Sequence, residues 1–465
     1  MIIRNGIDQE RIEPLNKKGS VAGGYVLYWM QQSQRASDNH ALEYAVNLAN
    51  EKSLPVVVLF CLMDDYPDAN LRHYTFMLEG LRETRAALKQ RGITMVVRHG
   101  FPPDEAVELA ARACCLVCDR GYMPHQRVWR ERVAKKAHCQ VIQVESDVVV
   151  PVRVASGKAE FSARTIRPKI HRYVQAFLHD IPQTGVKKPS INMDMESLDL
   201  EDLDALTDML DIDRSVSPVS RFFTGGTDRA KSIFHEFMHH KLERYDSNSN
   251  QPQTDDVSHM SPYLHFGQIS PVYLAREILQ FRDRYPDSAD AFLEQLIVRR
   301  ELAMNFVTYT PDFHSLTCLP DWAQKTLREH AHDRREYTYT LEELEHAQTH
   351  DEYWNAAMHE MCSTGFMHNY MRMYWGKKVL QWSASPDKAF HTLVYLNNKY
   401  FLDGRDPNSY TGVAWIFGLH DRAWNERSIF GKVRYMAASG LERKCDIKAY
   451  VRKVAQQVQE TTAKG

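Results

Sequence analysis

The first 150 residues alternate between short apolar runs and longer amphipathic segments, and this alternation constrains the fold more than any other feature. Apolar runs lie at 25–30, 55–62, 93–98, 114–118 and 140–144. Helical spacing of apolar residues follows the first four runs, at about 41–49, 71–91, after Pro103 and from Pro124. The run at 55–62 is unbroken, which is typical of a strand buried on both faces. The pattern predicts an α/β, Rossmann-like parallel sheet with helices on both faces.

No dinucleotide-binding loop is predicted on this sheet. The glycine-rich phosphate fingerprint follows the first strand, whereas Gly23 and Gly24 precede it here. A nucleotide-binding α/β protein with an unrelated helical cap is nevertheless one alternative, and a colourless purified protein would favour it.

The cysteines predict core thiols and no metal site. Cys115 and Cys118 have CxxC spacing, with Cys114 and Cys139 nearby, but the pair lies inside an apolar run and no second CxxC exists. The chain opens without a signal peptide and has no run long enough to span a bilayer. We therefore expect a soluble, reduced, intracellular (cytoplasmic) protein with no membrane contact, and a monomer.

A chain of 465 residues is too long for one ordinary core, so two domains are expected. We predict an α/β domain at 1–180, an acidic linker at 181–226 and an all-α domain at 227–465. Within the linker, Leu198, Leu203, Leu206 and Leu210 among acidic residues predict one amphipathic helix over 194–213, in a solvated connector. Helical patterns in the second half lie at 229–245, 271–281, 291–309, 322–332, 351–362, 366–382 and 386–400.

Two tryptophans in the second half suggest redox chemistry. Trp375 and Trp382 are seven residues apart on one predicted helix, so they share a face about 10 Å apart along the axis. That spacing suits an electron hop between indoles. Spacing alone favours core anchors, because aromatic residues dominate cores.

Three further segments have both a functional and an ordinary explanation. Ser258 and the Pro-initiated turn at 261–267 suit a pyrophosphate, or are a common helix entry. Arg372 stands among aromatic residues and methionines and needs a partner if buried, for which Asp403 is available. The basic, aromatic tail at 420–444 suits DNA phosphates and stacked bases, or is a solvated face. The net charge of −2 leaves room for such a local patch.

Taken together, five segments resemble the photolyase/cryptochrome family, specifically its class II cyclobutane pyrimidine dimer (CPD) photolyases. They are Ser261-Pro-Tyr-Leu-His-Phe-Gly-Gln-Ile-Ser270, Leu296-Ile-Val-Arg-Arg-Glu-Leu302, Met371-Arg-Met-Tyr-Trp-Gly-Lys-Lys378, Leu402-Asp-Gly-Arg-Asp-Pro-Asn408 and His420-Asp-Arg-Ala-Trp424. The resemblance implies an α/β antenna domain, an all-α FAD-binding domain and light-dependent repair of UV-damaged DNA. Reduced FAD would pass an electron to a flipped-out dimer, whose ring opens before the electron returns.

The resemblance also implies roles for individual residues. The FAD contacts would be Tyr245, Val257, Ser258, Met260 and Ser261, with the Arg372–Asp403 pair beside the isoalloxazine and Asn397 facing flavin N5. Trp375, Trp354 and Trp382 would form the electron path, and Glu294 would bind the dimer bases. Asn250, Met373, Trp415 and Trp424 would line the lesion pocket, and Arg422 and Arg434 would hold the opened strand. The antenna chromophore is left open between an 8-hydroxy-deazaflavin, a folate and none.

Two positions depart from relatives. Ser249 stands where many relatives have arginine, and Val298 stands where some have a tryptophan that packs on the lesion. Both changes bear on lesion affinity. A cryptochrome-type light sensor is the alternative function, but such sensors often carry a long C-terminal extension, and this chain ends soon after its last predicted helix.

Overall fold

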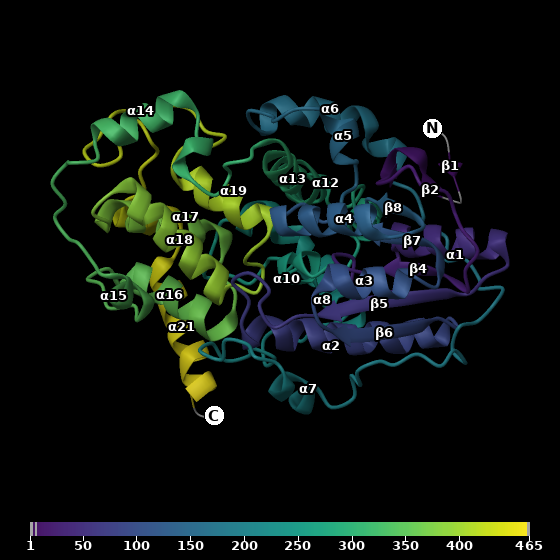
Figure 1. Ribbon diagram of the computed structural model, residues 1–465. Coiled ribbons are helices and arrows are strands. Elements are labelled where there is room, and N and C mark those ends of the chain that lie inside the picture. The colour runs from purple at the N-terminus through teal and green to yellow at the C-terminus, as the bar shows by residue number, and fades with distance from the viewer. Residues whose placement is uncertain (1–2, 5–6, 463–465) are drawn as a thin grey trace.

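The N-terminal half is built on a six-stranded sheet with the strand order β3-β8-β7-β4-β5-β6 (Figure 1). The computed structural model describes residues 3–4 and 7–462. The strands are β3 (Ile12–Pro14), β4 (Tyr25–Trp29), β5 (Val56–Leu62), β6 (Thr94–His99), β7 (Ala113–Asp119) and β8 (Gln140–Val144), and β1 (Ile3–Arg4) pairs separately with β2 (Ile7–Asp8). β4 to β8 are parallel to one another and β3 is antiparallel to β8. The five predicted strands are confirmed; β3, with three residues, was missed.

Helices cover both faces of this sheet. The helices of this half are α1 (His40–Lys52), α2 (Leu71–Gln90), α3 (Pro102–Ala110), α4 (Pro124–Lys136), α5 (Val152–Ala155) and α6 (Ala163–Phe177), with a 3₁₀ turn η1 at Gln9–Arg11. The face of the sheet that carries Val58 packs against α1 and α2. The opposite face, which carries Leu59, packs against α3 and α4. Successive strand residues point to opposite faces, so a sheet covered on both sides needs unbroken apolar runs.

The four cysteines singled out in the sequence are buried, as expected for core thiols. Cys114, Cys115 and Cys118 are buried on β7, and Cys139 is buried just before β8. Among the described residues, no group of three or more His, Cys, Asp or Glu side chains is arranged to hold a metal ion.

The acidic segment forms a shorter helix than predicted. Only α7 (Leu203–Met209) is helical, and Asp202 begins it by accepting a hydrogen bond from the Ala205 amide at 2.9 Å. Leu198 lies outside it and donates its amide to the Val97 carbonyl at 2.8 Å, beside β6. The leucines of this segment pack on the N-terminal core instead of facing solvent. The predicted solvated connector is therefore wrong in this respect: the leucines hold the segment against the sheet.

The second half is helical, as predicted. Its elements are α8 (Thr227–His240), η2 (Leu242–Arg244), α9 (Tyr245–Asn248), α10 (Ser261–His265), α11 (Pro271–Leu279), α12 (Pro286–Leu293), the π-helical η3 (Glu294–Arg299), α13 (Arg300–Tyr309), η4 (Leu316–Cys318), α14 (Asp321–Glu329), α15 (Leu341–Glu345), α16 (Glu352–Thr364), α17 (Asn369–Trp382), α18 (Pro386–Tyr400), α19 (Pro407–Ile416), α20 (Ala438–Lys444) and α21 (Ile447–Thr462). Over residues 227–462 the only β-pairing is an isolated antiparallel β-bridge between Arg427 and Gly431. No helix within the described ranges is long and apolar enough to cross a membrane.

The two halves share their cores. Tyr122 and Val148 of the first half belong to the cluster built around Trp354, and Val149 belongs to the cluster around Phe234. Glu301 of α13 accepts the Val149 amide at 2.5 Å. Burial raises the pKa of that carboxyl to about 8. The helical half is therefore positioned by the sheet domain through buried contacts.

Candidate active site

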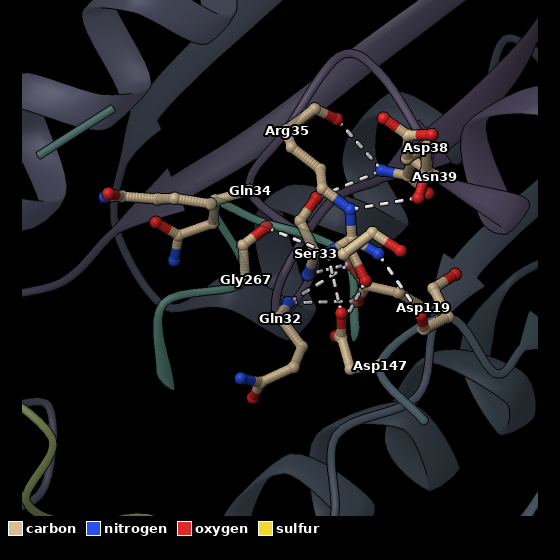
Figure 2. Close-up of polar contacts among 12 residues, drawn as sticks. Gln32, Ser33, Gln34, Arg35, Asp38, Asn39, Asp119, Asp147 and Gly267 are labelled. Atoms are coloured by element: carbon tan, nitrogen blue, oxygen red, sulfur yellow. Dashed lines mark hydrogen bonds and ion pairs between the residues drawn. The ribbon is translucent and has the colours of Figure 1, made fainter. Parts of the chain in front are cut away.

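The crevice at the carboxyl end of the sheet is filled by the chain's own carboxylate. The strand order reverses between the paired strands β4 and β7, and doubly wound folds bind nucleotides at such a point. Asp119, at the end of β7, accepts the backbone amides of Gln31, Gln32 and Ser33 at 2.8–3.1 Å (Figure 2). Burial raises the pKa of this carboxyl. These amides are the donors a phosphate would use, so the geometry agrees with the predicted lack of a dinucleotide loop.

A buried ion pair ties this crevice to the helical half. Arg35 binds Asp147 at 2.7 Å and also donates to the carbonyl of Gly267 at 2.9 Å (Figure 2). Gly267 has φ +64°, and a Cβ there would stand 1.8 Å from the carbonyl oxygen of Gln32. The contact fixes the end of the 258–267 segment against the sheet domain.

Beside the crevice lies a cavity of about 80 Å³ lined by both halves. Its lining includes Trp29 and Trp129 of the sheet domain and Arg405 of the helical half. The side-chain amides of Gln31 and Gln34 also line it, and buried polar atoms of both lack a hydrogen-bond partner among the described residues. Buried amides are normally satisfied, so these atoms mark a place for a polar ligand or water.

In the helical half, the predicted ion pair forms. Arg372 on α17 reaches both carboxylate oxygens of Asp403 at 3.0 Å. Its guanidinium also stands 3.9 Å from the ring centre of Phe401. Asn397, one turn before the end of α18, is buried and donates its side-chain amide to Asn398 at 3.0 Å.

Three buried tryptophans form a file next to this pair. Trp354 on α16 donates its indole N–H to the Trp375 carbonyl at 3.0 Å, and its ring centre lies 5.6 Å from that of Trp382. Trp375 and Trp382 share α17 as predicted, and Trp354 bridges them. The indole nitrogen of Trp375 has no partner among the described residues.

Beyond Trp382 stand two aromatic residues that sequence reasoning missed. The ring of Tyr339 is 5.2 Å and that of His350 is 5.4 Å from Trp382, and the Tyr339 hydroxyl meets His350 Nδ1 at 2.6 Å. Both lie in the long, irregular segment before α16, where no periodicity pointed to the core.

The predicted pyrophosphate strip lies between α9 and α10. Tyr245 is buried against Phe237, with ring centres 5.5 Å apart, and Met260 is buried before α10. The half-buried hydroxyls of Ser258 and Ser261 have no protein hydrogen-bond partner among the described residues, and Val257 is half-buried beside them. These groups are therefore free for a polar ligand.

Glu294 and Trp415, far apart in sequence, are joined by an arginine. Glu294 begins η3 and accepts two hydrogen bonds from Arg167 of α6, at 2.7 and 3.0 Å, and one from Arg299 at 3.0 Å. Arg299 in turn stands 5.5 Å from the Trp415 ring centre. Burial alone would raise the pKa of Glu294, but the two arginines outweigh it and lower that pKa.

Glu294 and Val298 also line a cavity of about 420 Å³ between α6 and η3. Neither arginine partner of Glu294 was predicted. Arg167 lies on a helix interrupted by Pro168, which hid the helix pattern.

The remaining predicted DNA residues lie at the surface. Trp424 is 40% exposed and is flanked by Arg422 and Arg434, whose guanidinium carbons stand 5.1 and 5.2 Å from its ring centre. Met373 is half-buried on α17. Asn250 is exposed in the turn after α9, and Gln251 ties this turn to the Lys444 carbonyl of α20 at 3.0 Å. The structure thus shows no contact between Asn250 and Glu294.

Comparisons with known proteins agree with this arrangement. A family model described as DNA photolyase matches residues 26–187. The chain is 50% identical to a deoxyribodipyrimidine photo-lyase of Methanothermobacter thermautotrophicus, over 96% of this chain and 98% of the relative. It is 40% identical to one of Potorous tridactylus, over 92% and 81%. The solved cryptochrome of Synechocystis sp. PCC6803 has a similar fold, with a TM-score of 0.73 at 15% identity over 92% and 88% of the two chains. The chain belongs to the DNA photolyase family.

Proposed function

We propose that this protein is a class II photolyase, a carbon–carbon lyase that binds FAD and uses light to repair cyclobutane pyrimidine dimers in DNA. One observation carries the proposal. Phe401 lies between the tryptophan file and the ion pair, with its ring centre 6.2 Å from that of Trp375 and 3.9 Å from the Arg372 guanidinium. A buried file of indoles that ends beside a charged pair suits electron delivery to a redox cofactor.

The residues present fit FAD. The free hydroxyls of Ser258 and Ser261 would hold the pyrophosphate, with Val257 beside them. The buried Tyr245 and Met260 would pack against the ribityl part of the cofactor. The indole nitrogen of Trp375 is also without a hydrogen-bond partner among the described residues. Reduced FAD, when bound, supplies the light absorption and the electron that opens the dimer.

The protein's share is electron supply and positioning. Trp382, Trp354 and Trp375 would carry electrons inward in that order, because Trp354 contacts both of the others. Arg372 and Asp403 would lie beside the isoalloxazine, where their fixed charges tune its potential without leaving an unpaired buried charge.

On the DNA side, Glu294 would accept hydrogen bonds from the dimer bases. Its lowered pKa keeps it ionised and therefore an acceptor. Trp415 would pack on the lesion with Met373, while Arg422, Trp424 and Arg434 would hold the strand from which the dimer has flipped. Asn250, exposed in the turn after α9, would also contact the lesion.

An antenna chromophore is proposed for the cavity between the domains. Three side-chain atoms, Gln31 Nε2 and Oε1 and Gln34 Oε1, lack a partner among the described residues, and with the ring of Trp129 they suit an aromatic, polar-edged chromophore such as a deazaflavin or a folate.

The test is repair itself. The purified protein is expected to be yellow, and with reduced FAD and blue light it should remove dimers from a dimer-containing oligonucleotide. A dark sample and a (6-4) photoproduct oligonucleotide serve as controls, and neither should change. Dimers that persist under light with reduced FAD bound would contradict the proposal. A light-dependent change in partner binding without repair would favour a sensor instead.

A further inference from the structure

Asn397, the asparagine proposed to face the flavin, is held by its neighbour Asn398. Asn398 is 2% exposed, near the end of α18. Its oxygen accepts the side-chain amide of Asn397 at 3.0 Å and the backbone N–H of Arg405 at 2.9 Å. Its nitrogen donates to Asp68 at 2.9 Å and to the Tyr410 hydroxyl at 3.3 Å. The amide of Asn398 thus fills four hydrogen bonds, the capacity of its group.

The orientation of this amide is fixed from both ends. A backbone N–H can only donate, so the atom that faces Arg405 must be the oxygen of Asn398. An ionised carboxylate can only accept, so the atom that faces Asp68 must be the nitrogen. Gly404 permits the turn, because a Cβ there would stand 2.8 Å from the Asn397 carbonyl oxygen.

The orientation passes on to Asn397. Because Asn398 presents its oxygen, Asn397 must turn its NH₂ group toward it. The oxygen of Asn397 is left over, and no donor among the described residues reaches it. If the amide of Asn398 flipped, Asn397 would present its nitrogen to the cofactor instead.

Asp68 lies in the other domain, on the loop between β5 and α2. Its position is locally unfavourable in two ways. It is a non-glycine residue at φ +57°, in the left-handed region that residues other than glycine adopt at a cost. It also places a negative charge near the carboxyl end of α18, where the helix dipole favours cations. An acid is an unusual residue to cap the carboxyl end of a helix. A carboxylate is, however, a suitable hydrogen-bond acceptor for the side-chain nitrogen of Asn398.

We infer that Asp68, together with the backbone N–H of Arg405 and acting through Asn398, is a positioning residue that holds Asn397 with its oxygen toward flavin N5. The inference rests on the proposed function. An oxygen there would accept a hydrogen bond from N5–H and so would stabilise the protonated ring nitrogen. The sheet domain would thereby influence the protonation of a cofactor bound by the helical domain.

The test compares Asp68→Ala with Asp68→Asn in the FAD-bound protein. The asparagine keeps an acceptor oxygen for Asn398, whereas alanine removes it. Asp65→Ala, an exposed neighbour on the same loop, is the matched control. Visible spectra recorded during stepwise reduction report the ratio of N5-protonated to unprotonated half-reduced cofactor. The pH is chosen so that the unchanged protein shows both forms.

Asp68→Ala should lower that ratio about tenfold, the effect of one hydrogen bond of about 1.4 kcal/mol. Asp68→Asn and Asp65→Ala should stay within about twofold of the unchanged protein. Equal ratios in all four proteins, or equal losses in both Asp68 variants, would overturn the inference while leaving repair intact. An unchanged protein that takes up no flavin would overturn the proposed function as well.

Discussion

Replacing Trp354 with phenylalanine should separate photoreduction from repair. Trp354 is fully buried, and its indole N–H donates to the Trp375 carbonyl at 3.0 Å. Phenylalanine removes that hydrogen bond, at about 1 kcal/mol, and leaves a void where the second ring was, at about 2 kcal/mol. The expected loss is therefore about 3 kcal/mol, or about 6–12 °C in the unfolding temperature of a domain of this size.

The functional effect should be larger than the structural one. Illumination of the oxidised, FAD-bound variant with an external reductant should reduce the cofactor at least about tenfold more slowly, because the indole of Trp354, which contacts both Trp375 and Trp382, is gone. When its FAD is reduced chemically instead of by light, the Trp354→Phe variant should still repair dimers at the normal rate. The matched control is Trp322→Phe, a partly buried tryptophan that packs on the same core but outside the file.

Two results would refute this reasoning. Photoreduction of Trp354→Phe at the normal rate would show that electrons reach the flavin by another route. A loss of repair in the chemically reduced variant, in proportion to its loss of photoreduction, would show that the substitution damages the flavin site and not the path.

Three further changes test the site and its scaffold. Arg167→Met removes the strongest partner that keeps the pKa of Glu294 low, so the acid limb of the repair rate should move to higher pH. Burial lowers the pKa of Lys377 to about 7, so between about pH 7 and its ordinary 10.5 the unfolded chain binds more protons than the folded one. Unfolding temperature should therefore rise with pH across that window, and Lys377→Met should flatten the rise. Asp119→Ala leaves three amides and the Tyr28 hydroxyl without an acceptor, and should lower the free energy of unfolding by about 4 kcal/mol in denaturant titrations.

The sheet was predictable because its burial is recorded in the sequence. A strand covered on both faces must be apolar at every position, and β5 and β8 were placed within a residue of their bounds. α18 was placed correctly because Ser385 caps it and Pro386 begins it. The helix of the acidic segment was predicted too long for the opposite reason: Leu198 follows the helical spacing, but it lies before α7 in a non-helical stretch that packs on the N-terminal core.

The site was predictable only where its chemistry is local or family-wide. The Trp375–Trp382 spacing was visible on one helix, but the bridging role of Trp354 depends on how α16 packs against α17. The Arg167 partner of Glu294 lies 127 residues away, and the Asp68 partner of Asn398 lies 330 away. No periodicity or spacing encodes such a pair, because each member is an ordinary polar residue until the domains meet.

The contacts between the domains explain why the flavin half cannot be treated as a separate unit. The last carbonyls of a helix need partners, and those at the end of α18 find them in the first turn of α2. Asn70 donates to the Lys399 carbonyl at 2.8 Å and Arg72 to that of Tyr400 at 2.7 Å, while His73 contacts that of Phe401 at 3.0 Å. Burial lowers the pKa of His73 well below its usual range, so the ring is neutral and its Nε2–H is the donor to Phe401. Since Phe401 also joins the tryptophan file to the ion pair, the sheet domain fixes the helix end on which the proposed electron path and the proposed flavin contacts converge.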